Sequence, residues 1–538
     1  MSRSYEEFLI GKAPRGELFG FEPSGTSEVL YPFQKAIVEW ALRRGRAAIF
    51  ADCGMGKSFM QVEWGRQVAE QTGKPVLFVA PLAVSKQTIN EALKLGVSIE
   101  RVFGPAASPA LQITNYEQLR KFVGSQEYSG IVLDESSILK SLDGKTRTML
   151  LTEFSSIPYR LCCTATPAPN DVSELANHAH FLGAMSRAEM LATYFVHDMD
   201  DGGWRLKGHA SKDMWQWMAQ WAVYVRRPSD LGFEDEGWAL PPMRVRDDIV
   251  ETGLKLKLGG IGKRSQIRRE TLPMRVLRAA EVILNSDRQF IVWCGLNDEG
   301  RQLAALLGEK CVLVEGADSE DSRAKKELAW RSGSVQTLVS KAKIFGFGMN
   351  WQHCSNVLFL GLGDSYEQYY QAIRRCWRYG QTSAVDVRVV VSDCEEAISE
   401  NIKRKEAEAH SMAESIVEAM REKQTTAVRT DREEKYMTDV RSEENWVMLL
   451  GDCVEKTREI ESGCIGFSVY SPPFSSLYTY SASRRDLGNC SSDAQFFEHM
   501  GYLIPELLRA TMPGRRTAVH CQQLSTTKAT NGYIGWRD

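Results

Sequence analysis

A glycine-rich segment near residue 50 has the residue types that bind a nucleotide phosphate. It reads Ala51-Asp-Cys-Gly54-Met-Gly56-Lys57-Ser58 and lies directly after an apolar run and before a helical pattern. Gly54 and Gly56 let the backbone turn so that its amides and the next helix N-terminus face phosphate oxygens. Lys57 is expected to neutralise the β- and γ-phosphates, and Ser58 to offer its hydroxyl to Mg²⁺. The segment therefore predicts a site for ATP and Mg²⁺.

Two consecutive carboxylates supply the second half of this predicted site. Ile131-Val-Leu-Asp134-Glu135 is an apolar strand pattern that ends in both of them. Asp134 is expected near the metal ion, and Glu135 is expected to orient and deprotonate an attacking water. Together with Lys57, which precedes them in the chain, they predict hydrolysis of ATP.

Short apolar runs that alternate with helical patterns are expected to position these residues. Because the runs are apolar on both faces, they predict central strands of parallel sheets, and the fold class is α/β. They fall into two sets, so two lobes are expected, over residues 28–184 and 246–395. The expected strands are Ala47–Ala51, Val76–Ala80, Ile131–Asp134, Leu161–Thr164, Phe290–Cys294, Cys311–Val314, Thr337–Ser340, Val357–Leu360 and Val385–Val391.

The segments outside the two sets differ in composition. Residues 1–27 are expected to be an N-terminal extension, and residues 185–245, which are rich in tryptophan, a helical insertion. Residues 396–445 are expected to form a long helix followed by a polar linker, because their second half is charged and poor in apolar residues. A third α/β pattern begins near Trp446 and occupies residues 446–538.

Segments around the ATP motifs resemble those of superfamily-two helicases, in the same order. Leu30-Tyr-Pro-Phe-Gln34 resembles their Q motif, whose glutamine pairs with adenine. Ala80-Pro81-Leu82 resembles motif Ia and Thr114-Asn115-Tyr116 motif Ib, which implies that Pro81, Thr114 and Asn115 contact nucleic acid. Ala51, where the general phosphate-loop pattern has glycine, is usual in this family.

Motif III of the same family has a counterpart in Thr164-Ala-Thr166-Pro. In these helicases it couples the ATP site to nucleic acid, and the resemblance implies this coupling role for Thr164 and Thr166. Ser340-Lys341 followed by Gly346-Phe-Gly348 resembles motif V. This implies that Ser340 and Lys341 contact nucleic acid and that Gly348 lies by the nucleotide.

Motif VI resembles the segment from Gln371 to Gln381, in the form Q-A-x-x-R-x-x-R-x-G-Q. Arg375 and Arg378 are spaced i and i+3, so they are expected on one face of a helix. From there they would reach across the cleft to the γ-phosphate as arginine fingers, with Gln371 beside them.

The ending of motif VI and the segments Arg226-Arg227 and Leu240-Pro are most similar to Swi/Snf-type motors, which translocate on duplex DNA without separating its strands. The resemblance covers residues 28–395. It implies two tandem RecA-like lobes and an ATP-dependent translocase or helicase with double-stranded DNA as its track. The alternatives are a helicase that unwinds RNA or single strands and a catalytically silent DNA-binding scaffold. Asp-Glu-Ser-Ser in place of Asp-Glu-Ala-Asp argues against an RNA helicase, and Lys57 and Glu135 argue against a silent scaffold.

The third domain contains Ser471-Pro472-Pro473-Phe474 at the end of a predicted strand. This tetrapeptide resembles motif IV of methyltransferases that modify adenine N-6 or cytosine N-4. The resemblance implies that the prolines fix the backbone, that Ser471 accepts a hydrogen bond from the exocyclic amine, and that Phe474 stacks on a flipped base.

The S-adenosylmethionine loop of these enzymes, F-x-G-x-G, is absent between Phe474 and Asp538. We therefore expect an incomplete Rossmann-like methyltransferase domain in a fragment or a truncated chain, which would use S-adenosylmethionine only if the missing part were supplied. A motor joined to such a domain resembles phage-encoded methylase–helicase fusions.

Composition limits the other function classes. The net charge of −3 means that DNA binding must depend on local patches such as residues 244–278, where ten Lys/Arg face four Asp/Glu. A solvated helical face explains that patch equally well. No apolar stretch approaches the roughly 20 residues of a membrane span, and no signal peptide is visible. We expect no membrane partner and a cytoplasmic location in a bacterial or phage-infected cell. The twelve cysteines include no C-x-x-C pair, which argues against a zinc ribbon.

Overall fold

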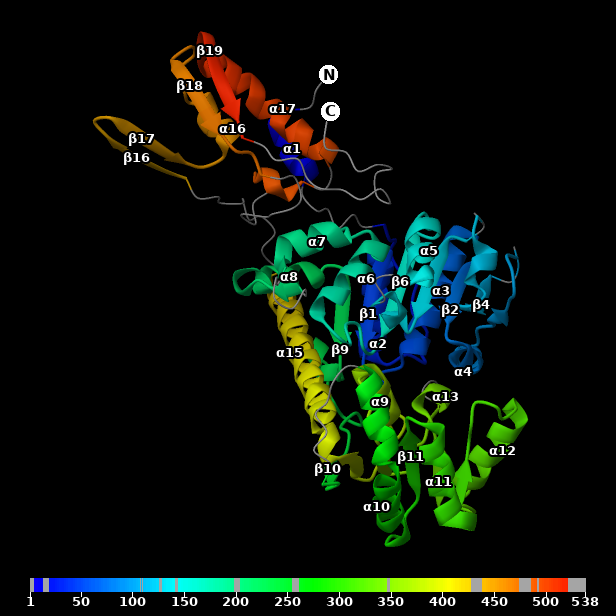
Figure 1. Cartoon of the computed structure of the whole chain (residues 1–538). Helices are drawn as coiled ribbons and strands as arrows, with labels where there is room; N and C mark the ends of the chain where they lie inside the picture. Colours follow the sequence, from blue (N-terminus) through cyan, green and yellow to red (C-terminus); the bar gives the residue numbers. More distant parts are fainter. Residues whose placement is uncertain are drawn as a thin grey trace. The chain divides into compact units, whose positions relative to one another are not determined.

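The chain divides into two compact units. The computed structural model (Figure 1) describes residues 4–12, 19–106, 108, 110–124, 128–140, 144–197, 204–253, 261–345, 349–426, 438–473, 485–490 and 493–520. The larger unit consists of Leu18–Leu182 and Trp215–Lys423, and the smaller unit of Met1–Glu17, Gly183–Met214 and Gln424–Asp538. The larger unit holds both predicted lobes.

The first lobe is a seven-stranded parallel sheet in the order β3-β4-β2-β5-β6-β1-β9. Its central strands are buried along their whole length, which explains their unbroken apolar sequences. The strands are β1 (Arg46–Ala51), β2 (Val76–Ala80), β3 (Glu100–Arg101), β4 (Leu111–Asn115), β5 (Gly130–Asp134), β6 (Tyr159–Thr164) and β9 (Ala222–Val225). The helices are α2 (Pro32–Arg44), α3 (Lys57–Thr72), α4 (Leu82–Lys94), α5 (Lys145–Glu153) and α6 (Leu175–Leu182).

The second lobe is a six-stranded parallel sheet in the order β10-β15-β14-β11-β13-β12. Its strands are β10 (Met243–Val250), β11 (Phe290–Cys294), β12 (Cys311–Leu313), β13 (Thr337–Ser340), β14 (Asn356–Leu360) and β15 (Val385–Ser392). Its helices are α9 (Ile261–Glu270), α10 (Leu272–Leu284), α11 (Asn297–Leu307), α12 (Glu320–Arg331), α13 (Ala342–Phe345) and α14 (Tyr366–Ile373). The two sheets confirm the predicted α/β class with tandem RecA-like lobes.

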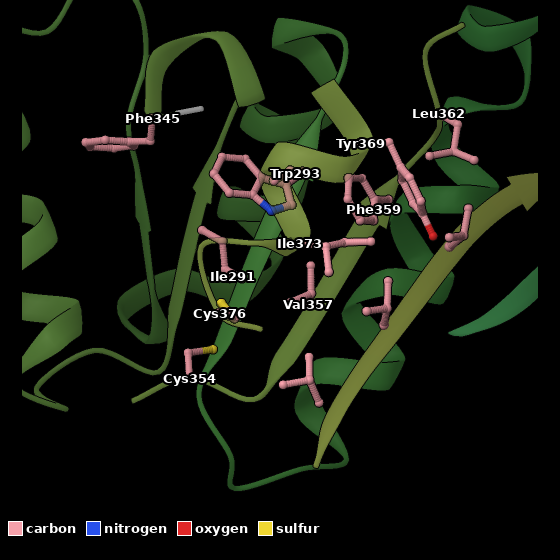
Figure 2. Close-up of a cluster of buried hydrophobic side chains, with 14 of the residues drawn as sticks. Ile291, Trp293, Phe345, Cys354, Val357, Phe359, Leu362, Tyr369, Ile373 and Cys376 are labelled. Atoms are coloured by element: carbon pink, nitrogen blue, oxygen red, sulfur yellow. The ribbon is translucent and has the colours of Figure 1, made fainter. Parts of the chain in front are cut away.

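The core of the second lobe fixes the position of α14. Figure 2 shows Tyr369 and Ile373 of this helix among Trp293 and Phe359 of the sheet. The rings of Phe359 and Tyr369 lie 5.0 Å apart, and Trp293 stacks on Trp351 at 5.9 Å. Because aromatic side chains bury large areas, this packing holds one face of α14 firmly against the sheet. Its opposite face is left for other contacts.

A long helix, α15 (Glu396–Thr426), connects the two lobes (Figure 1). Its 31 residues correspond to about 46 Å of helix. Near its start Ser399 donates a hydrogen bond to Asp247 of β10 at 3.0 Å. Near its end Arg421 donates to the carbonyl of Ser229, just beyond β9, at 2.7 Å. The helix therefore bridges elements of both sheets.

The smaller unit contains short strands and helices from three parts of the chain. Its helices are α1 (Tyr5–Lys12), α7 (Arg187–Tyr194), α16 (Cys453–Arg458) and α17 (Asp493–Ala510), and α8 (Ser211–Met218) crosses the boundary between the units. The hairpin strands are β7 (Phe195–His197) with β8 (Trp204–Leu206) and β16 (Asp439–Glu443) with β17 (Trp446–Leu450). A parallel pair consists of β18 (Ile465–Tyr470) and β19 (Thr511–Val519).

The N-terminal helix belongs to the core of this smaller unit. Phe8 is fully buried, and with Tyr5 it packs in one cluster with Val454 of α16 and Met500 of α17. Tyr5 also donates a hydrogen bond from its hydroxyl to Asp452 at 2.8 Å. The sequence predicts an N-terminal extension over residues 1–27, whereas the structure packs α1 into a core. This contact spans more than 440 residues, and no local sequence pattern indicates it.

All nine strands expected from the sequence are present, and differences occur in the segments between them. The segment 185–245, expected to be helical, also contains β7, β8 and β9. The Ala-Val-Tyr-Val sequence of β9 favours a strand, and this strand pairs with β1 at the sheet edge. The end of the expected linker forms β16. None of the described helices is long and apolar enough to cross a bilayer.

We predict that Phe8→Ala destabilises the smaller unit by about 3–5 kcal/mol, because it removes a fully buried aromatic side chain. The measurement is hydrogen exchange of the α17 amides, which should lose protection, while the amides of β1 and β5 should keep theirs. The matched control is Phe497→Ala on α17, a side chain that is 69% exposed. Equal protection of α17 in both variants would contradict the packing of α1 in this core.

Candidate active site

The phosphate loop follows β1 and leads directly into α3. Gly54 and Gly56 have φ angles of 96° and 79°, in the region that favours glycine. A Cβ atom would lie 2.9 Å from the Tyr379 nitrogen at Gly54 and 2.2 Å from Gln34 Nε2 at Gly56. Both conformation and space therefore require glycine here. Lys57 and Ser58 are the first residues of α3, whose N-terminus carries the positive end of the helix dipole.

Lys57 lies among acidic groups at the mouth of this loop. Its ammonium donates a hydrogen bond to the Ala51 carbonyl at 2.9 Å. Burial lowers the pKa of Lys57, but the nearby acidic groups, Cys53 and Glu135 among them, raise it by more than burial lowers it. The pKa of Lys57 is therefore above its usual value. The side chain is thus charged at neutral pH, as a partner of ATP phosphates must be.

Asp134 ends β5 and has the properties of a cation ligand. Its Oδ1 accepts hydrogen bonds from Gln61 Nε2 at 2.8 Å and from the Glu135 amide at 3.0 Å. Burial raises the pKa of Asp134, although Gln61 and Lys57 oppose the shift. The described residues contain no group of three or more His, Cys, Asp or Glu that could hold a metal by themselves. The buried carboxylate of Asp134 is a ligand of the kind that binds Mg²⁺ together with phosphates and water.

Glu135 has an unusual backbone and a shifted carboxyl group. With φ at 50° it is the one non-glycine residue at positive φ within the described ranges. Such strain is found where a surrounding structure enforces it, often at active sites. Burial raises the pKa of Glu135 to about 7, with Asp134 adding to the shift and Lys57 opposing it. A carboxylate with this pKa is suited to act as a general base near neutral pH.

The segment that resembles motif III contacts the predicted base. The Thr164 hydroxyl at the end of β6 donates to Glu135 Oε2 at 3.3 Å, and the Thr166 amide donates to the Thr164 oxygen at 3.1 Å. Thr164 lies on the strand between β5 and β1, so the carboxyl ends of three adjacent parallel strands carry the site. Of the two predicted coupling residues, Thr164 therefore contacts the predicted base, and Thr166 contacts Thr164.

The arginines of motif VI reach the site from the second lobe, but not from a helix. The structure corrects the expected helical face, because α14 ends at Ile373 and both Arg375 and Arg378 lie in the turn that follows. The Trp351 amide donates to the Arg375 carbonyl at 2.9 Å and helps to hold that turn. Burial lowers the pKa of Arg375 to about 10, while Cys53 of the phosphate loop opposes the shift. A buried guanidinium beside the phosphate loop favours an anionic ligand such as a γ-phosphate.

Gln34 and Gln371 are both buried close to these motifs. Gln34 donates from Nε2 to the Met55 carbonyl at 2.9 Å and accepts from the Tyr31 amide at 3.0 Å. It therefore ties α2 to the phosphate loop, and pairing with adenine would require an exchange of these bonds. Gln371 Nε2 has no hydrogen-bond partner within the part of the chain that the structure describes.

The residues expected to contact nucleic acid have different environments. Pro81 precedes α4, and Thr114 and Asn115 end β4, on the same sheet edge as the phosphate loop. Ser340 is fully buried and donates its hydroxyl to the Val314 carbonyl at 3.1 Å, so it is occupied inside the lobe. Lys341 follows it immediately before α13. Gly348 and Phe474 lie outside the described residues.

Three arginines of the basic segment 244–278 form ion pairs within the second lobe. Arg275 is fully buried and pairs with Glu299 at 2.8 Å and with Glu395 at 3.4 Å. Arg268 pairs with the same two carboxylates, and Arg278 pairs with Asp248 and Glu281. This arrangement favours a structural role for these three arginines over a continuous DNA-binding patch.

In the smaller unit, Ser471 and His520 lie at the carboxyl ends of the parallel strands β18 and β19. The exposed Ser471 hydroxyl donates to the His520 carbonyl at 3.1 Å, and Pro472 and Pro473 are half-buried beside it. Ser471-Pro472-Pro473 thus follows a strand, as expected, at the carboxyl end of the strands, where ligands of α/β folds bind.

Comparison with known proteins supports the nature of the second lobe. Residues 275–380 match the family model described as helicase conserved C-terminal domain. The matched residues lie within the second lobe. The match includes Gln371, Arg375 and Arg378, together with the strands β11 to β14.

Among solved structures, the one described as the Sulfolobus solfataricus SWI2/SNF2 ATPase core in complex with dsDNA is 18% identical to this chain. The aligned region covers 76% of this chain and 99% of that one, with a TM-score of 0.38. No curated protein matches the chain.

Sequence reasoning missed several residues around the site. Tyr116 donates to the Asp134 carbonyl at 2.6 Å, and Arg374 forms an ion pair with Asp52 at 2.6 Å. Arg374 is adjacent to Arg375, but its partner is more than 300 residues away. No spacing rule within a single sequence indicates such a contact.

We predict that ATP hydrolysis at this site depends on the ionisation of Glu135. The base acts when deprotonated, and burial raises its pKa to about 7, so kcat/KM should fall as pH drops through about 7. The decrease should approach about tenfold for each pH unit below the pKa. The measurement is steady-state hydrolysis between pH 5.5 and 8.5, with exposed Glu153→Gln as a control that keeps the profile. A flat profile over this range would exclude Glu135 as the titrating base.

Proposed function

We propose that this chain is an ATP-dependent DNA translocase of the helicase type, which hydrolyses ATP between its two lobes and moves along double-stranded DNA. The observation that carries the proposal is the convergence of charges from both lobes. Lys57 and Glu135 come from the first lobe. The second lobe supplies Arg375, whose neighbour Arg374 forms an ion pair with Asp52 of the phosphate loop at 2.6 Å.

The chemistry follows from the positions of these groups. Lys57 and the amides of the phosphate loop bind the phosphates, and Mg²⁺ held by Ser58 and Asp134 would neutralise phosphate charge. Glu135 accepts a proton from a water whose oxygen forms a bond to the γ-phosphorus. The bond between that phosphorus and the β–γ bridging oxygen breaks, which releases ADP and phosphate. Arg375 and Arg378 stabilise the charge that develops on the γ-phosphoryl oxygens.

Motion is expected to arise because ATP contacts both lobes. A bound γ-phosphate holds the lobes together through Arg375 and Arg378, and hydrolysis removes that contact. The hydrogen bond from Thr164 to Glu135 links the base to motif III. The DNA backbone would be contacted by Pro81, Thr114, Asn115 and Lys341. Contacts to DNA phosphates position a protein on the duplex without reading the base sequence.

The test of this function is ATP hydrolysis under four conditions: without nucleic acid, with duplex DNA, with single-stranded DNA and with RNA. We predict stimulation of at least about tenfold by duplex DNA and a loss of at least about a hundredfold in Glu135→Gln, because general-base catalysis contributes about 10²–10⁴-fold. Stimulation only by RNA or single strands would favour an unwinding helicase. Absence of hydrolysis with every polymer would favour a DNA-binding scaffold.

The smaller unit supports a second function. We infer that it is the target-base part of an adenine N-6 or cytosine N-4 methyltransferase, related to the methylase–helicase fusions of phages. The placement of Ser471 beside His520 at adjacent strand ends supports this inference. Methyl transfer by such a unit would require S-adenosylmethionine and a loop that binds it.

We predict that the chain binds duplex DNA with a mismatched base pair more tightly than matched duplex, because a mismatched base costs less to flip. The preference should be about tenfold or more and should fall in Ser471→Ala, which removes the expected acceptor. Fluorescence anisotropy without ATP measures both affinities, and Ser411→Ala, at an exposed position of α15, is the control. Equal affinity for the two duplexes would contradict base flipping by this unit.

A further inference from the structure

Helix α14 and the residue that caps its C-terminus present three polar side chains on one face, opposite to the core face. Glu367 and Tyr370 lie on the helix and Arg374 is its C-cap, and their i, i+3 and i+7 spacing puts them along one side. The other side carries Tyr369 and Ile373, which pack in the core of the second lobe (Figure 2). The polar face is directed to the first lobe, as its hydrogen bonds show.

One end of this face holds the phosphate loop. Arg374 donates from its guanidinium to Asp52 Oδ2 at 2.6 Å, and the Tyr370 hydroxyl donates to Asp52 Oδ1. The side chains of Arg374 and Asp52 are each 10% exposed. The guanidinium also lies 4.3 Å from the ring centre of Trp377 and 5.0 Å from that of Tyr370. These rings hold the arginine in place before it meets its partner.

Asp52 transmits this contact to the loop itself. Its Oδ1 accepts from the Cys53 amide at 2.6 Å, and its carbonyl accepts from the Met55 amide at 3.2 Å. Its own amide donates to Val225 of β9 at 2.9 Å. The residue is thus part of the turn that places Gly54, Gly56 and Lys57, and a force on its carboxylate acts on that turn.

The other end of the face holds the loop after the catalytic carboxylates. Glu367 accepts hydrogen bonds from Ser137 Oγ and Lys140 Nζ, both in the 3-10 helix η2 (Ser136–Lys140). This short helix begins directly after Glu135. Glu367 also raises the pKa of Glu135, which indicates that it is close enough to act on the base electrostatically.

These contacts differ from those expected of Arg375 and Arg378. The arginine fingers are aimed at a phosphate, whereas Arg374 has a carboxylate partner within the protein. A cavity of about 870 Å³ borders Asp52, Tyr370 and Arg374. Water can reach Asp52 and Arg374 through this cavity when the lobes separate. When the lobes close, Asp52 and Arg374 must pair with each other, because a buried charge without a partner destabilises the closed state.

We propose that Glu367, Tyr370 and Arg374 form an interlobe clamp that positions the phosphate loop and the base-bearing loop when the lobes close. The clamp residues are positioning residues, since they act through Asp52, Ser137 and Lys140. The effect on hydrolysis rests on the proposed ATPase function, whereas the effect on lobe closure does not.

Lobe closure can be measured with a native pair of residues. Lys86 of the first lobe and Glu320 of the second lobe are exposed and lie 2.9 Å apart. A zero-length carbodiimide reagent should join them in the closed state. Lys326 and Asp318, 2.8 Å apart within the second lobe, give an internal reference that closure does not change. The ratio of the two cross-linked peptides, measured by mass spectrometry on the full chain without nucleotide, reports closure.

We predict that Arg374→Gln and Glu367→Gln each lower this ratio by at least about fivefold, and that Arg374→Lys, which keeps the charge, lowers it less. Arg301→Ala, at an exposed site of α11, should leave the ratio unchanged. Thermal unfolding of each variant establishes that it is folded. A ratio unchanged in both folded glutamine variants would overturn the clamp.

Hydrolysis provides the second readout. Arg374→Gln should lower kcat/KM for ATP by about tenfold. Asp52→Asn should lower kcat/KM by a similar factor. The decrease in the double variant should be smaller than the product of the two single decreases, because both substitutions remove the same interaction. Independent losses that multiply would overturn the coupling between Arg374 and Asp52. If the parent chain does not hydrolyse ATP but the glutamine variants lose the cross-link, the clamp stands and the proposed ATPase function fails.

Discussion

The burial of opposite charges between two parallel sheets is the constraint on which the rest of this structure depends. Lys57, Asp134 and Glu135 stand at the carboxyl ends of strands in the first lobe, and the turn after α14 brings Arg375 to them. Charges removed from water are tolerated only if each finds a partner. Parallel strands meet this demand because their carboxyl ends and the following helix N-termini lie on one edge.

This constraint explains the character of α14. The helix must remain fixed to its own sheet and also meet the other lobe, and its sequence separates these tasks onto two faces. Aromatic and aliphatic residues such as Tyr369 and Ile373 bury one face, while the polar face contacts the two loops of the ATP site. Helix α15 adds a second bridge at a distance from the charges, through Asp247 and Ser229. Relative movement of the lobes therefore changes the ATP site and the outer bridge together.

Much of this organisation could be predicted from the sequence because its signals are local. The strand β5 is apolar along its length and ends in Asp134-Glu135, and the phosphate loop has glycines at the two positions where φ is positive. The turn that contains Arg375 and Arg378 could not be predicted, because the i, i+3 spacing of two arginines is also typical of a helix. The contacts of Arg374 with Asp52 and of Phe8 with the C-terminal core depend on tertiary structure and leave no periodic pattern. Burial of Ser340 was equally invisible, because a polar residue at a strand end is typically exposed.

The packing of α1 in the smaller unit has a consequence for the way the two units are joined. The polypeptide leaves α1, forms the two segments of the larger unit with Gly183–Met214 of the smaller unit between them, and returns to α16 and α17. One core of the smaller unit therefore combines residues that precede and follow the larger unit in the sequence. The entropy of closing such a loop grows only with the logarithm of its length, so a long intervening domain is tolerated. The core of the smaller unit can be completed only after α17 has been synthesised, when the larger unit has already emerged.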